Sequence, residues 1–218
     1  QNMAAVASGM AAMGKIPFIT SYAMFNPGRN WEQIRTTICY NDQNVKIVGS
    51  HAGVSVGPDG GTHQALEDIA LTRVLPRMTV IVPADAIEAR KATLAAAKHV
   101  GAVYIRLARE KSPIISTDDT HFEIGKASIL WGGGTADVAI FACGVLVYYA
   151  LRAARTLADM NISSTVVNVS TIKPLDKETI LNAVKEARAV VTVEEHQIHG
   201  GLGGAIAELL VMNHPMHI

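Results

Sequence analysis

The chain has 218 residues, enough for one large or two small domains, and its 49% hydrophobic and 17% charged residues can fill sizeable cores. The formal net charge is zero, which argues against a nucleic-acid partner or an anionic membrane surface. No apolar run approaches the ~18 residues needed to span a bilayer, so we expect a soluble cytoplasmic protein. Cys39 and Cys143 stand far apart outside any metal-ligand spacing, as expected of reduced, buried thiols.

Strands and helices alternate through the first half of the chain. The expected elements are a helix over residues 2–13, a strand over 17–21, a helix over 31–39, a strand over 46–48, a helix over 63–74, a strand over 79–82, a helix from 85 to about 100 and a strand over 102–107. Asp85 and Glu88 have the spacing of an N-terminal capping box. A series of this kind predicts a largely parallel sheet.

Turn-forming residues without apolar periodicity interrupt the pattern, and we place a linker at residues 113–122, between domains at 1–112 and 123–218. The second domain repeats the alternation. Its expected elements are a β-arm over 126–130, a strand over 138–142, a helix over 146–160, a strand over 164–169, a helix capped by Asp176, a strand over 189–193 and a helix over 203–212. The sequence therefore predicts a two-domain α/β protein.

A polar stretch between the strand at 46–48 and the next helix holds two imidazoles, His51 and His63, one carboxylate, Asp59, and several glycines. Thr62 is expected to cap a helix that starts near His63. The positive end of that helix would favour a neutral imidazole, which can relay protons near pH 7. The alternative is a plain turn in which the glycines meet backbone demands and the histidines only cap it.

The pattern H-x-x-x-x-V-G-x-D-G-x-T-H-Q begins at His51, and residues 80–85 add Val-Ile-Val-Pro-Ala-Asp. This combination resembles the pyrimidine-binding domain of transketolases. Residues 193–196 and 200–204 resemble the C-terminal domain of the same family, so the resemblance covers essentially the whole chain. It implies two consecutive three-layer α/β domains with largely parallel sheets. The family pattern places a cofactor-activating glutamate directly before Gln1, and we expect both ends to be truncated.

The resemblance assigns roles to four residues of the polar stretch and its surroundings. His63 would relay protons beside the cofactor's aminopyrimidine, and Asp59 would accept a hydrogen bond from a substrate hydroxyl. His51 and Arg109 would bind the sugar phosphate, for which a guanidinium is a suitable forked donor. The alternative for Arg109 is a surface ion pair with a carboxylate such as Glu110.

Two aromatic residues, Tyr22 and Phe25, match the aromatics that stack on the pyrimidine in this family. On spacing alone they would be ordinary core residues. Residues 26–30 form an insertion relative to the commoner pattern, which makes Phe25 the stronger cofactor-binding candidate and Tyr22 the weaker.

The resemblance implies thiamine diphosphate and Mg2+ as cofactors, with the metal and diphosphate ligands on an N-terminal subunit or domain that this chain lacks. It also implies a dimeric core, a heterotetramer with that partner and a place in the pentose phosphate pathway. The expected activity is ketol transfer between a ketose phosphate and an aldose phosphate. The alternatives are an enzyme like 1-deoxyxylulose-5-phosphate synthase, which shares the D-G-x-T-H-Q core, and a non-catalytic partner subunit.

Two further clusters have less specific patterns. The glycines at 200–204 lie between a strand and a helix, but their spacing is not that of a dinucleotide fingerprint. Glu194, Glu195 and His196 could bind a metal, although a cluster of this size is more often a hydrogen-bond network at an interface or turn. We expect the network.

Overall fold

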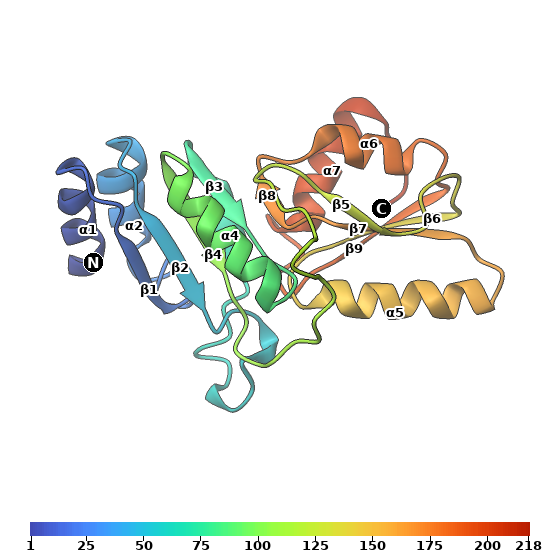
Figure 1. The fold of residues 1–218 in the computed structure, drawn as a ribbon, viewed down its shortest axis with the longest axis horizontal. Helices are drawn as coiled ribbons and strands as arrows, with labels where there is room; N and C mark the ends of the chain where they lie inside the picture. Colours follow the sequence, from blue (N-terminus) through green and yellow to red (C-terminus); the bar gives the residue numbers. More distant parts are fainter.

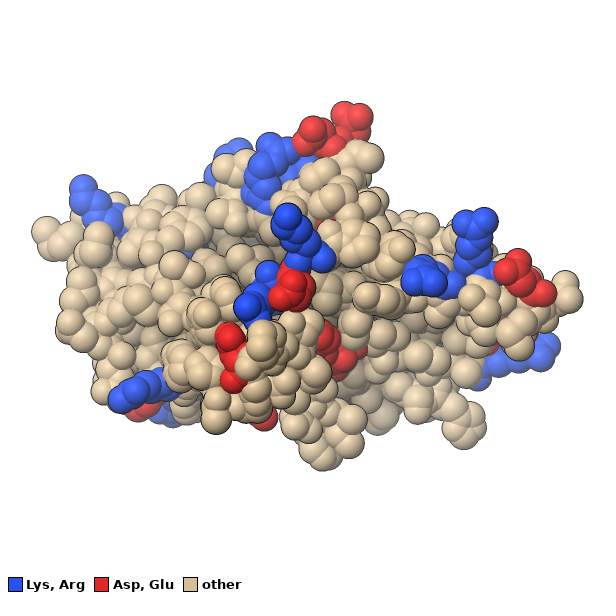
Figure 2. Space-filling model, turned by 90° about the horizontal axis from the view of Figure 1, so that it is seen from below, with Lys and Arg blue, Asp and Glu red and all other residues tan.

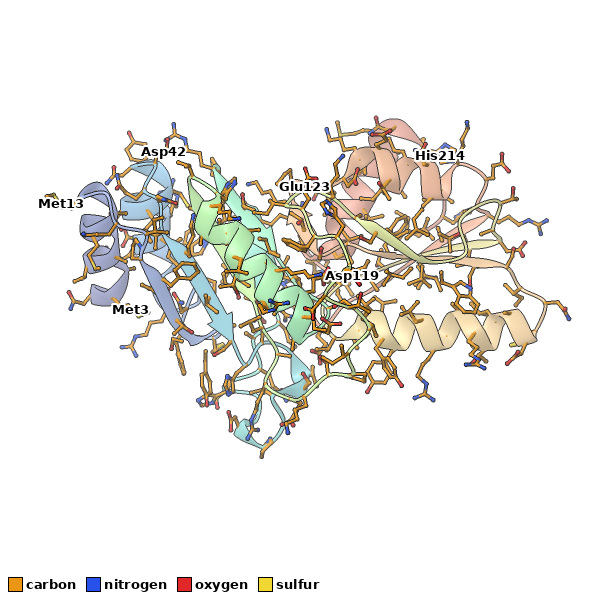
Figure 3. All side chains as sticks on the ribbon, in the orientation of Figure 1. Met3, Met13, Asp42, Asp119, Glu123 and His214 are labelled. Atoms are coloured by element: carbon orange, nitrogen blue, oxygen red, sulfur yellow. The ribbon has the colours of Figure 1, made fainter.

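The computed structural model describes residues 1–218, which form two α/β units side by side (Figure 1). The first unit runs from the N-terminus to the strand β4 (Ala102–Arg106), and the second from β5 (Ser128–Trp131) to the C-terminal helix α7 (Leu202–Asn213). Met3, on the first helix, and Met13, directly after that helix, mark the outer end of the first unit (Figure 3). The predicted fold class is confirmed.

The first sheet has five strands in the order β1-β2-β4-β3-β8, of which the last, β8 (Thr171–Lys173), comes from the second half of the chain. The first four pair in parallel, and they are β1 (Phe18–Tyr22), β2 (Lys46–Ser50), β3 (Met78–Ile81) and β4. The helical segments of this unit are α1 (Asn2–Ala12), α2 (Trp31–Gln33), a π-helix (Ile34–Tyr40), a 3₁₀ helix (Val54–Asp59), α3 (Asp68–Arg73) and α4 (Ala86–Lys98). Both β3 and β4 are buried along their whole length, as expected of central parallel strands with both faces covered.

The second sheet has four strands in the order β5-β7-β6-β9. Here β6 (Val138–Ala142) pairs in parallel with β7 (Ser164–Asn168) and β9 (Ala189–Val193), while β5 is antiparallel. The helix α5 (Leu146–Asp159) lies on one side of this sheet, and α6 (Lys177–Val184) and α7 lie on the other (Figure 1). The unit therefore has three layers.

The two units share one core. The strand β8 (Thr171–Lys173) belongs to the second half of the chain, yet it pairs antiparallel with β3 of the first sheet. One cluster of 29 buried residues includes Val80 and Tyr104 from the first unit and Phe141 and Val167 from the second. Each fully buried aliphatic side chain in such a cluster contributes roughly 1.5–3 kcal/mol. Much of the stabilising burial is therefore common to both units.

Both predicted carboxylate caps are confirmed. The Asp85 carboxylate accepts a hydrogen bond from Glu88 N at 2.8 Å and begins α4, and that of Asp176 accepts one from Thr179 N at 3.2 Å and begins α6. No helix of the structure combines the length and the apolarity needed to cross a bilayer.

Three expectations about elements are wrong. The helix expected from His63 begins only at Asp68, because Ala65 pairs with Ala52 in an isolated bridge that keeps the chain extended between these points. The helix expected over 31–39 is a short α-helical turn followed by the π-helix. The strand β8 was not expected, because three residues carry no recognisable periodicity.

Candidate functional site

The polar stretch forms a closed loop beyond the carboxyl end of β2. Ala52 and Ala65 pair at its neck, where Gly53 N also donates to Ala65 O at 2.9 Å. We call residues 53–64 the 53–64 loop; it projects from the lower edge of the molecule in Figure 1. Loops at the carboxyl ends of parallel strands are common ligand-binding positions. Figure 2, seen from that side, shows charges of both signs dispersed without one dominant patch.

His51 is held at the end of β2 with a left-handed backbone, at φ +56°. Its ring stacks on Tyr22 at the end of β1, with centroids 3.9 Å apart and planes 7° from parallel. The Ser50 hydroxyl lies 3.2 Å from Ser21 O and 3.0 Å from His51 Nδ1, so a contact on Nδ1 holds the orientation of the imidazole ring.

His63 completes an aromatic cluster with residues from β1 and the segment after it. Its ring meets the edge or face of Phe25 at 5.4 Å and 90°, and of Tyr22 at 5.8 Å and 73°. Its Nδ1 lies 2.9 Å from the Thr62 hydroxyl. Thr62 is therefore not a helix cap, and the expected effect of a helix dipole on His63 is wrong, because α3 starts five residues later at Asp68.

Arg109 anchors the 53–64 loop and does not simply form a surface ion pair. Its Nη1 donates to Val56 O at 2.6 Å, whereas the ion-pair distances to Asp59 and Glu110 are 3.9 and 3.8 Å. One oxygen of Asp59, Oδ2, is buried without a hydrogen-bond partner. Buried acceptors without a partner are uncommon in proteins, and they are accounted for by strain, a catalytic role or a bound water or ion.

Phe25 offers an exposed aromatic face beside an apolar groove. Its side chain is 40% exposed, and the groove has a volume of about 620 Å³. Its lining residues include Met24, Phe25, Gly28 and Leu71. The adjoining turn is fixed by Asn26, which is fully buried and whose amide donates to Ile19 O and Val48 O. A flat heteroaromatic ring could therefore lie on Phe25, while one face of Tyr22 is already covered by His51.

A buried ion pair supports the base of the loop, and our sequence analysis did not assign it a role. Asp68 Oδ2 accepts hydrogen bonds from Arg106 Nε at 2.8 Å and from the Tyr104 hydroxyl at 2.7 Å. Burial alone would lower the pKa of Arg106, but the neighbouring Asp68 carboxylate raises it above its ordinary value. Burial, with the same carboxylate, also raises the pKa of Tyr104 well above its ordinary value. The sequence did contain one indication of this ion pair: Arg106 is a charged residue at the end of the otherwise largely apolar strand β4.

The acidic cluster after β9 is a hydrogen-bond network, as expected. The Glu194 carboxylate accepts from Leu202 N and Gly203 N at 2.7 and 2.9 Å, at the start of α7. The Glu195 carboxylate instead reaches the first unit and accepts from Ser55. No group of three or more His, Cys, Asp and Glu side chains in the structure could hold a metal ion.

Two family models match the chain and cover most of its length. The transketolase pyrimidine-binding domain matches residues 1–114, and the transketolase C-terminal domain matches residues 125–217. The chain belongs to the transketolase family. The aromatic cluster, the 53–64 loop and Arg109 all fall in the first match, whereas Glu195 falls in the second.

Its relatives include subunits of divided transketolases. A protein of Methanocaldococcus jannaschii described as a transketolase C-terminal section is 46% identical over 98% of this chain. A 6-deoxy-6-sulfo-D-fructose transketolase subunit of a Clostridium species is 44% identical over 99%. Each alignment covers 66% of the relative, so the chain spans about two thirds of the length of these relatives.

Solved structures agree with this placement. A split-gene transketolase, described as an inactive β4 tetramer, superposes with a TM-score of 0.91 at 43% identity, over 99% of this chain and 69% of the other. The transketolase of Campylobacter jejuni superposes with a TM-score of 0.77 at 20% identity, over 96% of this chain and 38% of the other, which shows a shared fold.

Proposed function

We propose that this chain is the pyrimidine-binding and C-terminal part of a split transketolase, which transfers a two-carbon ketol unit from a ketose phosphate to an aldose phosphate. The observation that carries the proposal is the convergence of Phe25, His51 and His63 around Tyr22 at the carboxyl ends of β1 and β2. A scaffold subunit would need none of these side chains in these positions.

Thiamine diphosphate is the proposed cofactor, and it would supply a carbanion that carries the ketol unit. Phe25 would hold its pyrimidine end by stacking, which adds ~0.5–1.5 kcal/mol beyond area burial. Tyr22 would contribute its uncovered face as a secondary contact. The exposed ring of Phe25 and the adjoining apolar groove fit this end of the cofactor. The diphosphate and Mg2+ ligands would come from the partner subunit.

His63 is proposed as the proton-relaying residue. With the Thr62 hydroxyl on Nδ1, its Nε2 is left to exchange a proton with an oxygen of the substrate. Such general acid–base catalysis by a positioned histidine typically contributes 10²–10⁴-fold to the rate. The His63 ring centroid lies 5.4 Å from that of Phe25, so His63 would lie close to a cofactor ring that stacks on Phe25.

Asp59, Arg109 and His51 are proposed to bind the substrate. The free Oδ2 of Asp59 can accept a hydrogen bond from a sugar hydroxyl, which satisfies a buried acceptor. Arg109 commits Nη1 to Val56 O, which leaves Nη2 for an anionic group. His51 would offer Nε2 to the same group. The Clostridium relative is named for a sulfonated sugar and another, from Actinobacillus succinogenes, for apulose 4-phosphate.

The proposed partner is a subunit that carries the diphosphate-binding domain, and two such pairs would form a heterotetramer around a dimeric core. We also propose a cytoplasmic location, a role in the pentose phosphate pathway, and domains at residues 1–112 and 123–218 joined by a linker at 113–122. The split-gene relative, which is an inactive tetramer of β subunits, supports the need for a second subunit.

The test is a reconstitution. The natural protein that contains this sequence is mixed with its diphosphate-binding partner, thiamine diphosphate and Mg2+, and transfer from a ketose phosphate to an aldose phosphate is measured. We expect ketol transfer that disappears without the partner. Formation of 1-deoxyxylulose 5-phosphate instead would establish the synthase alternative, and no turnover with any donor would favour the non-catalytic role.

A further inference from the structure

We infer that Glu195, in the C-terminal unit, is a positioning residue for the substrate-binding end of the site. This inference rests on the proposed function and extends the site to Glu195, which lies 140 positions after its contact residue Ser55 in the sequence. The Glu195 carboxylate accepts two hydrogen bonds from one residue of the 53–64 loop. Ser55 N donates to Oε1 at 3.0 Å, and the Ser55 hydroxyl donates to Oε2 at 3.0 Å.

Ser55 lies in the first turn of the 3₁₀ helix Val54–Asp59. The first N–H groups of a helix have no partner within the helix. A carboxylate at this end accepts their hydrogen bonds, and its negative charge interacts favourably with the positive end of the helix. The backbone of the loop has to come close for this contact. Gly53 has φ +88°, and a Cβ at this position would lie 2.5 Å from Glu195 Oε2. Glycine at position 53 therefore permits the contact with Glu195.

The 3₁₀ helix carries Asp59 at its far end and is held by two anchors. Glu195 holds its beginning through Ser55, and Arg109 Nη1 holds its middle through Val56 O. Gly57, with φ +73°, interrupts the 3₁₀ helix. Because glycine has wide conformational freedom, the backbone at this point does little by itself to keep the helix rigid. The position of Asp59 relative to Arg109 therefore depends on these external anchors.

The segment that carries Glu195 is itself fixed to the first unit. Glu195 O accepts from Arg106 Nη2 at 2.7 Å, and Arg106 is paired with the buried Asp68. On the other side, Gln197 N donates to Leu66 O at 2.9 Å. The Glu195 carboxylate thus extends from a backbone segment fixed by hydrogen bonds to the 53–64 loop, and it can hold Ser55 in a defined position.

Glu195 should act on substrate binding more than on cofactor binding. Asp59 and Arg109 meet the anchored turn, whereas Tyr22 ends β1 and Phe25 lies in the segment that follows it. Releasing the turn would therefore misplace the substrate contacts and leave the aromatic ring of Phe25 in place. The signature is a raised KM for the sugar phosphate with an unchanged affinity for thiamine diphosphate.

The test uses the full-length chain assembled with its partner. Glu195→Ala removes both contacts to Ser55, whereas Glu195→Gln keeps one carboxamide oxygen as an acceptor. Glu194→Ala is the matched control, because the neighbouring Glu194 carboxylate also accepts two hydrogen bonds, from Leu202 N and Gly203 N at the start of α7. We expect Glu195→Ala to raise KM for the ketose phosphate tenfold or more, equivalent to about 1.4 kcal/mol. Glu195→Gln should give a smaller rise, and the control should stay within twofold.

A second measurement needs no activity. Exchange of the amide hydrogens of Ser55, Val56, Gly57 and Asp59 should accelerate at least tenfold in Glu195→Ala. The milder Ser55→Ala should give a smaller acceleration, and Glu194→Ala should give none. Equal KM values for Glu195→Ala and the control, or unchanged exchange in the turn, would overturn the inference. If the wild-type assembly transfers no ketol unit, the proposed function fails, and exchange alone decides whether Glu195 positions the turn.

Discussion

Replacing Asp68 by alanine should destabilise the full-length chain strongly. Asp68 Oδ2 accepts from both Arg106 Nε and the Tyr104 hydroxyl, and the side chains of Asp68 and Arg106 are 1% and 7% exposed. Without the carboxylate, a buried guanidinium and a buried hydroxyl lose their partner. Breaking a buried pair in this way typically destabilises by about 3–5 kcal/mol. For a chain of this size that corresponds to a fall in Tm of roughly 6–20 °C.

The matched control is the exposed ion pair between Arg73 and Glu208, whose side chains are 18% and 64% exposed. Glu208→Ala should cost at most about 1 kcal/mol, because surface pairs are solvent-screened. The assay is urea unfolding followed by circular dichroism for both variants. Adding Arg106→Met to Asp68→Ala should recover part of the loss, because it removes the unpaired charge. Similar losses for Asp68→Ala and the control would refute the reasoning.

Three further predictions concern single residues. His63→Ala in the assembled enzyme should lower turnover on the order of 10²–10⁴-fold without loss of folding, and unchanged turnover would rule out proton relay. Asp59→Ala should cost ~1–3 kcal/mol in kcat/KM with the preferred sugar and less with its epimer or deoxy analogue, whereas equal losses would indicate a purely structural role. Burial raises the pKa of Glu88, so this residue's contribution to stability is present below its unfolded pKa and lost as pH rises through its folded pKa. Glu88→Gln should therefore flatten the fall in unfolding free energy over that interval, and an unchanged slope in a denaturation series would contradict this.

The regular elements could be predicted where local signals were strong. The strands at 138–142 and 189–193 have the expected bounds, because short runs of β-branched residues mark them. The carboxylate caps at Asp85 and Asp176 were also predictable, since each contact lies within three residues.

What the sequence did not reveal depends on contacts between distant segments. Thr62 looked like a helix cap, but the pairing of Ala65 with Ala52 extends the chain and delays the helix. The contact between Glu195 and Ser55 joins segments 140 residues apart, and no local pattern encodes it. The family resemblance supplied the roles of the site residues, while the free Oδ2 of Asp59 became visible only in the folded chain.

The most direct test of the account is a titration of the diphosphate-binding partner into a fixed concentration of the natural protein that contains this sequence, with ketol transfer from a ketose phosphate as the readout. A site divided between two polypeptides should show no transfer without the partner and a rise that saturates at about one partner per chain. The same titration with His63→Ala should remain flat. Full activity of the chain alone, or no activity at any ratio, would contradict the assignment of this chain to a split transketolase.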